Sequence, residues 1–318
     1  MDARIDWSLD NTTGTVEEVW LLGQPPLPRY LDFVKKKAVC TANRPRAELV
    51  DEWREANDYF YSLETKEAGL ADQIRIRDLD QNLQPLIDDV RQDTRFRRAF
   101  DTLPTRFALV ELDRLVVSQS HVDLTHARRL QTRLVAGATP EDIFRFCLPI
   151  DGGEAPVQVR SLGSRRFLFW SRSSDFRFHE AALLEPDQIS EHSPYGSLGR
   201  VLGLMVGYGS NFLNAIQSEN RLVLHNGHHR AYALREMGIT HAPCIIRTVT
   251  RRDELNLVAS SDTAEDPTFF FKAARPPLLK DFFDPKVRKI LRVPKLLRAV
   301  EISFETKEYE LKDFELAD

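Results

Sequence analysis

Apolar residues recur at helical spacing through the first hundred residues of the chain. Asn43 and Pro45 mark the start of a helix, whose apolar face is formed by Leu49, Val50, Trp53, Ala56 and Phe60. A second amphipathic run follows at Leu83, Leu86, Ile87 and Val90, and a third helix is predicted from Asp93 to just before Pro104. Residues 1–29, broken by glycines and prolines, are expected to be irregular. The pattern predicts a helical N-terminal region over residues 1–105.

Helical and alternating patterns mix in the middle of the chain. Phe107–Val117 is typical of a strand and Asp123–Leu134 of a helix, and Thr139 with Pro140 starts a further short helix. From residue 157 the apolar period becomes two, which predicts a hairpin turning at Gly163 and a third strand at Phe176 and Phe178. We interpret residues 135–185 as a β-rich insertion.

The stretch 221–238 carries the most concentrated chemistry. Leu222–Leu224 is a short apolar run, Asn226-Gly227 is a turn dipeptide, and His228–Met237 is a run of helix formers closed by Gly238. A strand, a tight turn and a helix direct backbone N–H groups and the positive end of the helix dipole to one point. His228, His229 and Arg230 lie at that point, so the pattern predicts phosphate binding. A solvated helix start remains the alternative interpretation.

Segments on both sides extend this pattern. Phe212–Gln217, a turn at 218–220 and Arg221–His225 predict a hairpin that leads into the motif, with a helix over Ser197–Val206 before it. After Gly238 a strand is expected to begin near Pro243.

At these residues the chain resembles the ParB/sulfiredoxin superfamily. The superfamily's turn is written Gly-Glu-Arg-Arg in ParB, Gly-Gly-Cys-His-Arg in sulfiredoxin and Asp-Gly-x-His-Arg in related domains; here it is Asn226-Gly227-His228-His229-Arg230. Val110–Val122 is similar to the superfamily's opening strand and polar loop. The resemblance implies a ParB/sulfiredoxin-like domain over 106–250 that binds a nucleoside triphosphate, ATP or CTP, with Mg²⁺. It also implies that Gln119, Ser120 and His121 face the nucleotide.

The residues at the turn separate the chemistries of the superfamily. Sulfiredoxin's nucleophilic cysteine corresponds to His228, which cannot form the sulfur intermediate, so sulfiredoxin activity is not expected. Related free-serine kinases carry an acidic residue where this chain has Asn226. His121 is a candidate general base, with a structural histidine as the alternative, and His228 is the second candidate catalytic residue. No metal-ligand spacing is found, and Mg²⁺ is expected only with the nucleotide.

The C-terminal part, 251–318, is expected to hold a helical segment and a closing hairpin. The helix is predicted over Lys286–Arg298, interrupted at Pro294, with six basic residues on its outer side. Such a face could contact DNA or an acidic protein, or could simply be solvated. The hairpin is expected from Ala299–Phe304 and Glu308–Leu316.

Composition limits the class of protein. The net charge of −4 gives no overall attraction to nucleic acid, and three widely spaced cysteines favour a reducing compartment. No stretch of the sequence has the length and apolarity of a membrane span or a signal peptide, so a cytoplasmic protein with no membrane partner is expected. The pattern does not predict an oligomeric state.

Three functions follow from these observations. The leading hypothesis is an α+β protein with a ParB/sulfiredoxin-like core that binds a nucleoside triphosphate and acts as an NTPase or a phosphotransferase. The alternative is a non-catalytic, DNA-associated or partner-binding regulator that uses nucleotide as a switch. A nuclease is the third.

Overall fold

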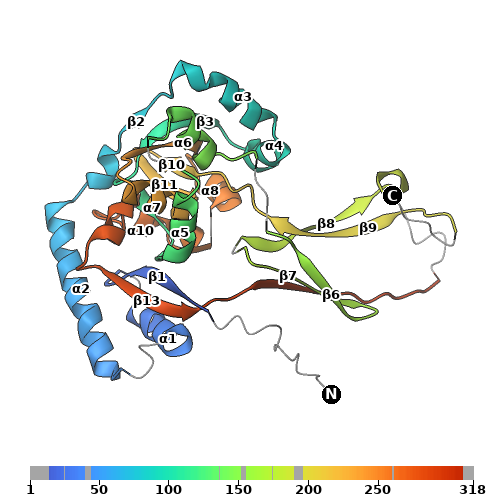
Figure 1. Ribbon diagram of the computed structural model, residues 1–318, viewed down its shortest axis with the longest axis horizontal. Coiled ribbons are helices and arrows are strands. Elements are labelled where there is room, and N and C mark those ends of the chain that lie inside the picture. Colours follow the sequence, from blue (N-terminus) through green and yellow to red (C-terminus); the bar gives the residue numbers. More distant parts are fainter. Residues whose placement is uncertain are drawn as a thin grey trace. The chain divides into compact units, whose positions relative to one another are not determined.

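The chain forms a mixed α+β structure that divides into two compact units. Unit 1 comprises Met1–Gly152 and Ser210–Lys295, and unit 2 comprises Gly153–Gly209 and Leu296–Asp318. Figure 1 shows the ribbon of the computed structural model. The residues that the structure describes are 14–24, 26–39, 44–135, 137–151, 155–173, 175–189, 196–259 and 261–310.

The helices of the described residues lie mainly in unit 1. They are α1 Leu27–Lys37, α2 Arg46–Lys66, α3 Gln84–Gln92, α4 Thr94–Phe100, α5 Leu124–Gln131, α6 Pro140–Cys147, α7 His228–Glu236, α8 Arg252–Val258, α9 Ser261–Glu265 and α10 Pro267–Lys272. Short 3₁₀ turns are η1 Leu70–Gln73, η2 Gln81–Leu83, η3 Pro186–Gln188 and η4 Leu279–Phe283.

Two sheets organise unit 1. One has six strands in the order β2-β3-β12-β10-β11-β4, and the other has three in the order β13-β1-β5. Strand pairs β10–β12 and β11–β4 run parallel, and the other pairs run antiparallel. The strands are β1 Thr15–Leu21, β2 Ile76–Arg77, β3 Thr105–Glu111, β4 Val116–Val117, β5 His121–Asp123, β10 Asn214–Ser218, β11 Arg221–Asn226, β12 His241–Thr248 and β13 Arg288–Pro294.

Unit 2 is built from two small sheets. A three-stranded sheet has the order β14-β7-β6, and β8 pairs with β9 in a two-stranded ribbon. The strands are β6 Gln158–Gly163, β7 Arg166–Ser171, β8 Phe176–Leu184, β9 Val201–Tyr208 and β14 Arg298–Ser303.

The predicted helices form where the sequence supplies both an apolar face and a cap. α2 buries Leu49, Ala56 and Phe60 of its predicted face. α6 begins with a capping box in which the side chains of Thr139 and Asp142 accept each other's backbone N–H groups. The main core surrounds the six-stranded sheet, because the side chains on its central strands are almost completely buried.

Three predicted elements are wrong. Residues 15–21 form β1 rather than an irregular segment, because the strand is held between β13 and β5. Ser197–Val206 is not a helix; Val201–Tyr208 forms β9, paired along β8. Lys286–Arg298 is not an amphipathic helix, since Leu291 and Val293 of β13 are buried alternately with exposed neighbours, which is the period of a strand.

Smaller differences concern boundaries. Phe107–Val117 breaks into β3 and β4 at a turn near Asp113. β14 pairs with β7 instead of with the C-terminal segment, and residues 304–310 form no regular element. Residues 311–318 of the predicted hairpin lie outside the described residues. The β14–β7 pairing also joins residues beyond 295 to the predicted insertion, so the units differ from the three regions expected from the sequence.

Candidate functional site

The segment 110–122, here called the first motif, and the turn 226–230, called the second motif, are adjacent at one edge of the six-stranded sheet. β4 and β11 are parallel neighbours, with Val117 opposite Leu224, so the loop 118–120 and the turn 226–227 leave the sheet on the same side. Ser118 Oγ donates a hydrogen bond to the Leu224 carbonyl at 3.4 Å. The backbone N–H of Asp123 donates to His229 Nε2 at 3.1 Å. The first and second motifs therefore touch.

Gly227 makes the turn from β11 into α7. Its backbone has φ +92°, which favours glycine, and a Cβ at this position would lie 2.9 Å from the Cα of Leu213. Its N–H donates to the Asn226 side chain at 2.8 Å. No side chain caps α7, so the first-turn N–H groups of this helix have no partner from a capping residue. An uncapped helix N-terminus of this kind attracts an anion through its N–H groups and the helix dipole.

His228 is buried, His229 is half-buried, and both imidazoles are held in the neutral form. Only 5% of His228 is exposed, and its Nε2 has no hydrogen-bond partner among the described residues. Burial, together with the smaller effects of His225 and His121 nearby, lowers the pKa of His228 to about 3. Burial also holds the pKa of His229 well below its ordinary value. Because His229 Nε2 accepts from Asp123, we assign its proton to Nδ1.

The residues of the first motif take different positions. Gln119 donates through Nε2 to the His121 carbonyl at 2.7 Å, so its amide holds the loop. Ser120 is buried, and its Oγ has no partner among the described residues. His121 stacks on Trp20 of β1, with ring centroids 4.6 Å apart. Burial lowers the pKa of His121 to about 4, and its Nδ1 also has no partner in the part of the chain that is described.

Arg230, predicted to hold phosphate, contacts protein. It is 5% exposed, and its Nη1 donates to the backbone carbonyl of Asn211 at 2.6 Å and to the side-chain oxygen at 2.8 Å. Asn211 has φ 56°, a conformation that asparagine tolerates better than most residues. Arg230 therefore anchors α7 to the loop before β10.

Two basic residues that sequence reasoning missed lie near the site. Arg29 and Lys37, both exposed on α1, are close enough to His121 to contribute to lowering its pKa. They reach it because β1, which is adjacent to α1 in sequence, pairs with β5. Nothing in the local sequence links α1 to residue 121.

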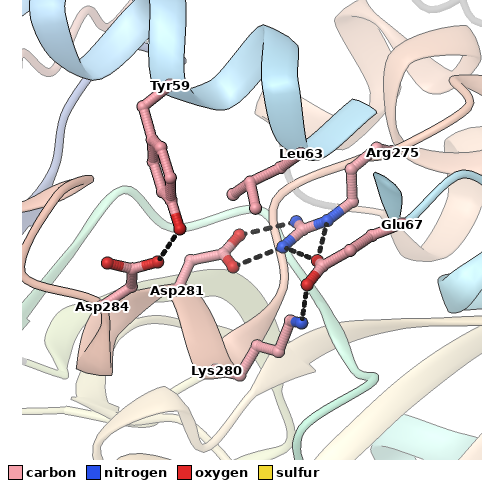
Figure 2. A pocket seen from close by; sticks show the side chains of 7 residues that line it. All are labelled: Tyr59, Leu63, Glu67, Arg275, Lys280, Asp281 and Asp284. Carbon is pink, nitrogen blue, oxygen red and sulfur yellow. Dashed lines mark hydrogen bonds and ion pairs between the residues drawn. The ribbon is translucent and has the colours of Figure 1, made fainter. Parts of the chain in front are cut away.

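Two cavities of the described residues lie elsewhere. The smaller, of about 100 Å³, is lined by Arg275, Lys280, Asp281, Asp284, Glu67, Tyr59 and Leu63, and Figure 2 shows Arg275 between two carboxylates. The larger, of about 450 Å³, is lined by Leu22, Glu52, Glu55, Ala56, Tyr59, Pro285, Lys286 and Arg288. Residues of the 226–230 turn line neither of these two cavities.

The remaining sequence predictions concern metals, membranes and the basic segment. Within the described ranges, no three His, Cys, Asp or Glu side chains are arranged to hold a metal ion. No helix in the same ranges has both the length and the apolarity needed to cross a bilayer. Basic residues of Lys286–Arg298 are distributed over β13, β14 and the segments beside them, and Lys289 pairs with Glu52. The predicted contact with DNA or an acidic protein stays a prediction.

Comparison with models of protein families, with curated proteins and with solved structures finds no match for this chain.

Proposed function

We propose that this chain binds a nucleoside triphosphate, ATP or CTP, with a phosphate group at the N-terminus of α7, in a module of the ParB/sulfiredoxin type. The observation that carries the proposal is the uncapped start of α7 together with two buried polar atoms that have no partner among the described residues, His228 Nε2 in the first turn of α7 and Ser120 Oγ in the loop after β4, the strand that pairs with β11. A buried polar atom without a partner costs free energy, and an oxyanion would satisfy several such groups together.

Neutral donors, rather than paired charges, would hold the phosphate. The first-turn N–H groups, the Ser120 hydroxyl and the His228 imidazole can all donate without carrying charge. Arg29 and Lys37 add positive charge near His121. Mg²⁺ would be held by the phosphates themselves, as is usual for this cation, with few protein ligands.

Binding is better supported than catalysis. Asn211 occupies two donor positions of Arg230, the guanidinium that would stabilise a transferring phosphoryl group. With its pKa lowered to about 4, His121 is neutral at pH 7 but weakly basic. Both observations favour a nucleotide-dependent switch. They disfavour the other hypothesis, an NTPase or phosphotransferase in which His121 and His228 are catalytic residues.

Calorimetric titration with ATP, CTP and GTP, with and without Mg²⁺, tests the proposal. We expect binding by the wild type and at least about tenfold weaker binding by Ser120→Ala, the loss of one hydrogen bond to a charged group. His241→Ala is the matched control, because His241 Nε2 is another buried atom without a partner among the described residues, on β12. If none of the three nucleotides binds, the proposal is wrong. Phosphate release at saturating nucleotide then separates enzyme from switch.

A further inference from the structure

The larger of the two cavities, of about 450 Å³, is lined by residues from three segments of unit 1. Its lining residues on α2 lie on one side of the helix, because they are three or four positions apart: Glu52, Glu55, Ala56 and Tyr59. The other two segments are Leu22, which follows β1, and residues 285–288, which lead into β13. The volume lies within the roughly 300–1,000 Å³ that is typical of small-molecule sites.

Hydrogen bonds and close packing hold the three segments around this cavity together. The backbone N–H of Leu22 donates to the Val287 carbonyl at 2.7 Å. Asn57 of α2 donates through Nδ2 to the Gly23 carbonyl at 2.6 Å. Gly23 lies so close to α2 that an added Cβ would be 2.6 Å from the carbonyl carbon of Ala56. The cavity is therefore preformed, which lowers the entropy that a ligand must overcome to bind there.

Three charged side chains that line the cavity have no ion pair with any described residue. They are the carboxylate of Glu55 and the cations of Lys286 and Arg288. Glu52, the fourth charged lining residue, is already paired with Lys289 of β13. The cavity therefore presents one negative and two positive charges that the described part of the chain does not neutralise.

Uncharged groups hold both cations in place. Lys286 Nζ lies 4.7 Å from the centre of the Tyr59 ring, which is a cation–π contact. The Tyr59 ring is itself fixed, because its hydroxyl donates to Asp284 at 3.0 Å (Figure 2). Arg288 Nη1 donates to the backbone carbonyl of Phe282 at 3.1 Å, and its other N–H groups have no partner among the described residues. Cations positioned in this way lose little side-chain entropy when they bind the anionic groups of a ligand.

We propose that this cavity binds a free acidic amino acid, glutamate or aspartate. The two carboxylates of such a ligand match Lys286 and Arg288, and its ammonium group matches Glu55. The guanidinium can hold one carboxylate through two parallel N–H bonds, and the apolar lining residues can contact the methylene carbons. A dicarboxylate without the amine would place no cation beside Glu55, and an uncharged side-chain amide would leave one of the two cations unpaired.

Calorimetric titration of the full chain with L-glutamate and L-aspartate, up to about 5 mM so that weak binding is detected, tests the proposal. We expect saturable binding of at least one of them by the wild type. Two analogues of the amino acid that binds are then compared with it: the dicarboxylate glutarate or succinate, and the amide glutamine or asparagine. Each analogue should bind about tenfold more weakly, because each loses one charged hydrogen-bonding group.

Two variants of exposed residues assign the charges. Glu55→Gln should weaken binding of the acidic amino acid about tenfold without weakening the dicarboxylate, whereas Lys286→Gln should weaken both. Asp58→Asn is the matched control for Glu55→Gln, since Asp58 is exposed on α2 and does not line the cavity. The proposal is overturned if neither amino acid binds, if the dicarboxylate binds as tightly as the amino acid, or if Glu55→Gln behaves like Asp58→Asn.

Discussion

Arg275 offers the sharpest test of how unit 1 is held together. Its side chain is completely buried and donates to both oxygens of Asp281 at 2.7 and 2.6 Å, and to Glu67 at 3.0 Å (Figure 2). Asp281, 2% exposed, also accepts the backbone N–H of Leu278 at 2.8 Å. The cluster joins the residue following α2 to η4, so two distant parts of the chain depend on one guanidinium.

The substitution Arg275→Ala should lower the free energy of unfolding by about 3–5 kcal/mol, the usual result of leaving a buried charge without its partner. Glu67 would keep its ion pair with Lys280, whose Nζ lies 2.6 Å from the carboxylate. Most of the lost stability therefore comes from Asp281, which would be left as a buried carboxylate without this guanidinium. In a domain of this size the melting temperature should fall by about 10 °C. Arg275→Met combined with Asp281→Leu should recover part of the stability, because no buried charge is left alone.

Urea unfolding followed by circular dichroism measures these differences. Arg54→Ala is the control, since Arg54 and Asp51 form a surface pair 3.7 Å apart that should contribute less than about 1 kcal/mol. If Arg275→Ala loses no more stability than Arg54→Ala, the assignment of a stabilising role to this cluster is incorrect.

Two further predictions concern the turn. The pKa of His228 is lowered to about 3 in the folded chain, so below the unfolded value of about 6.5 only the unfolded state takes up its proton and stability falls as the pH is lowered. His228→Gln should remove up to about 1.4 kcal/mol per pH unit from the slope between pH 6 and 4, measured by urea unfolding; an unchanged slope would contradict its burial as a neutral imidazole. Gly227→Ala should destabilise the fold by about 2 kcal/mol or more, because of its positive φ and the approach of Leu213. Gly199→Ala should change the stability little, because no atom lies within 4 Å of the added Cβ. In thermal melts, Gly227→Ala should therefore unfold at a lower temperature than Gly199→Ala.

Local sequence patterns predicted the elements whose causes are local. The hairpin before Gly227, the helix after it and the capped helix at Thr139 were all predicted, because turn residues, caps and apolar spacing lie within a few positions of each other. The meeting of the 118–121 loop with the turn was expected from the resemblance, and the parallel pairing of β4 with β11 brings them together.

The sequence patterns did not predict the strands that are stabilised by pairing with segments far away in the sequence. β1 and β13 form one ladder although they lie at opposite ends of the chain, and neither segment alternates strongly enough to indicate a strand alone. The contacts of Arg230 were also missed, because its partner Asn211 precedes it by 19 residues on an irregular loop. Arg29 and Lys37 reach the site only through β1.

The function proposed for this chain depends on phosphate binding at the start of α7. Backbone amide resonances of Gly227–Arg230 and the ring-nitrogen resonances of His228, followed by NMR during titration with a nucleoside triphosphate and with the corresponding nucleoside, test it most directly. We expect saturable shifts of these resonances with the triphosphate and none with the nucleoside at equal concentration. Binding of the triphosphate that leaves 227–230 unshifted, or equal shifts with the nucleoside, would contradict it.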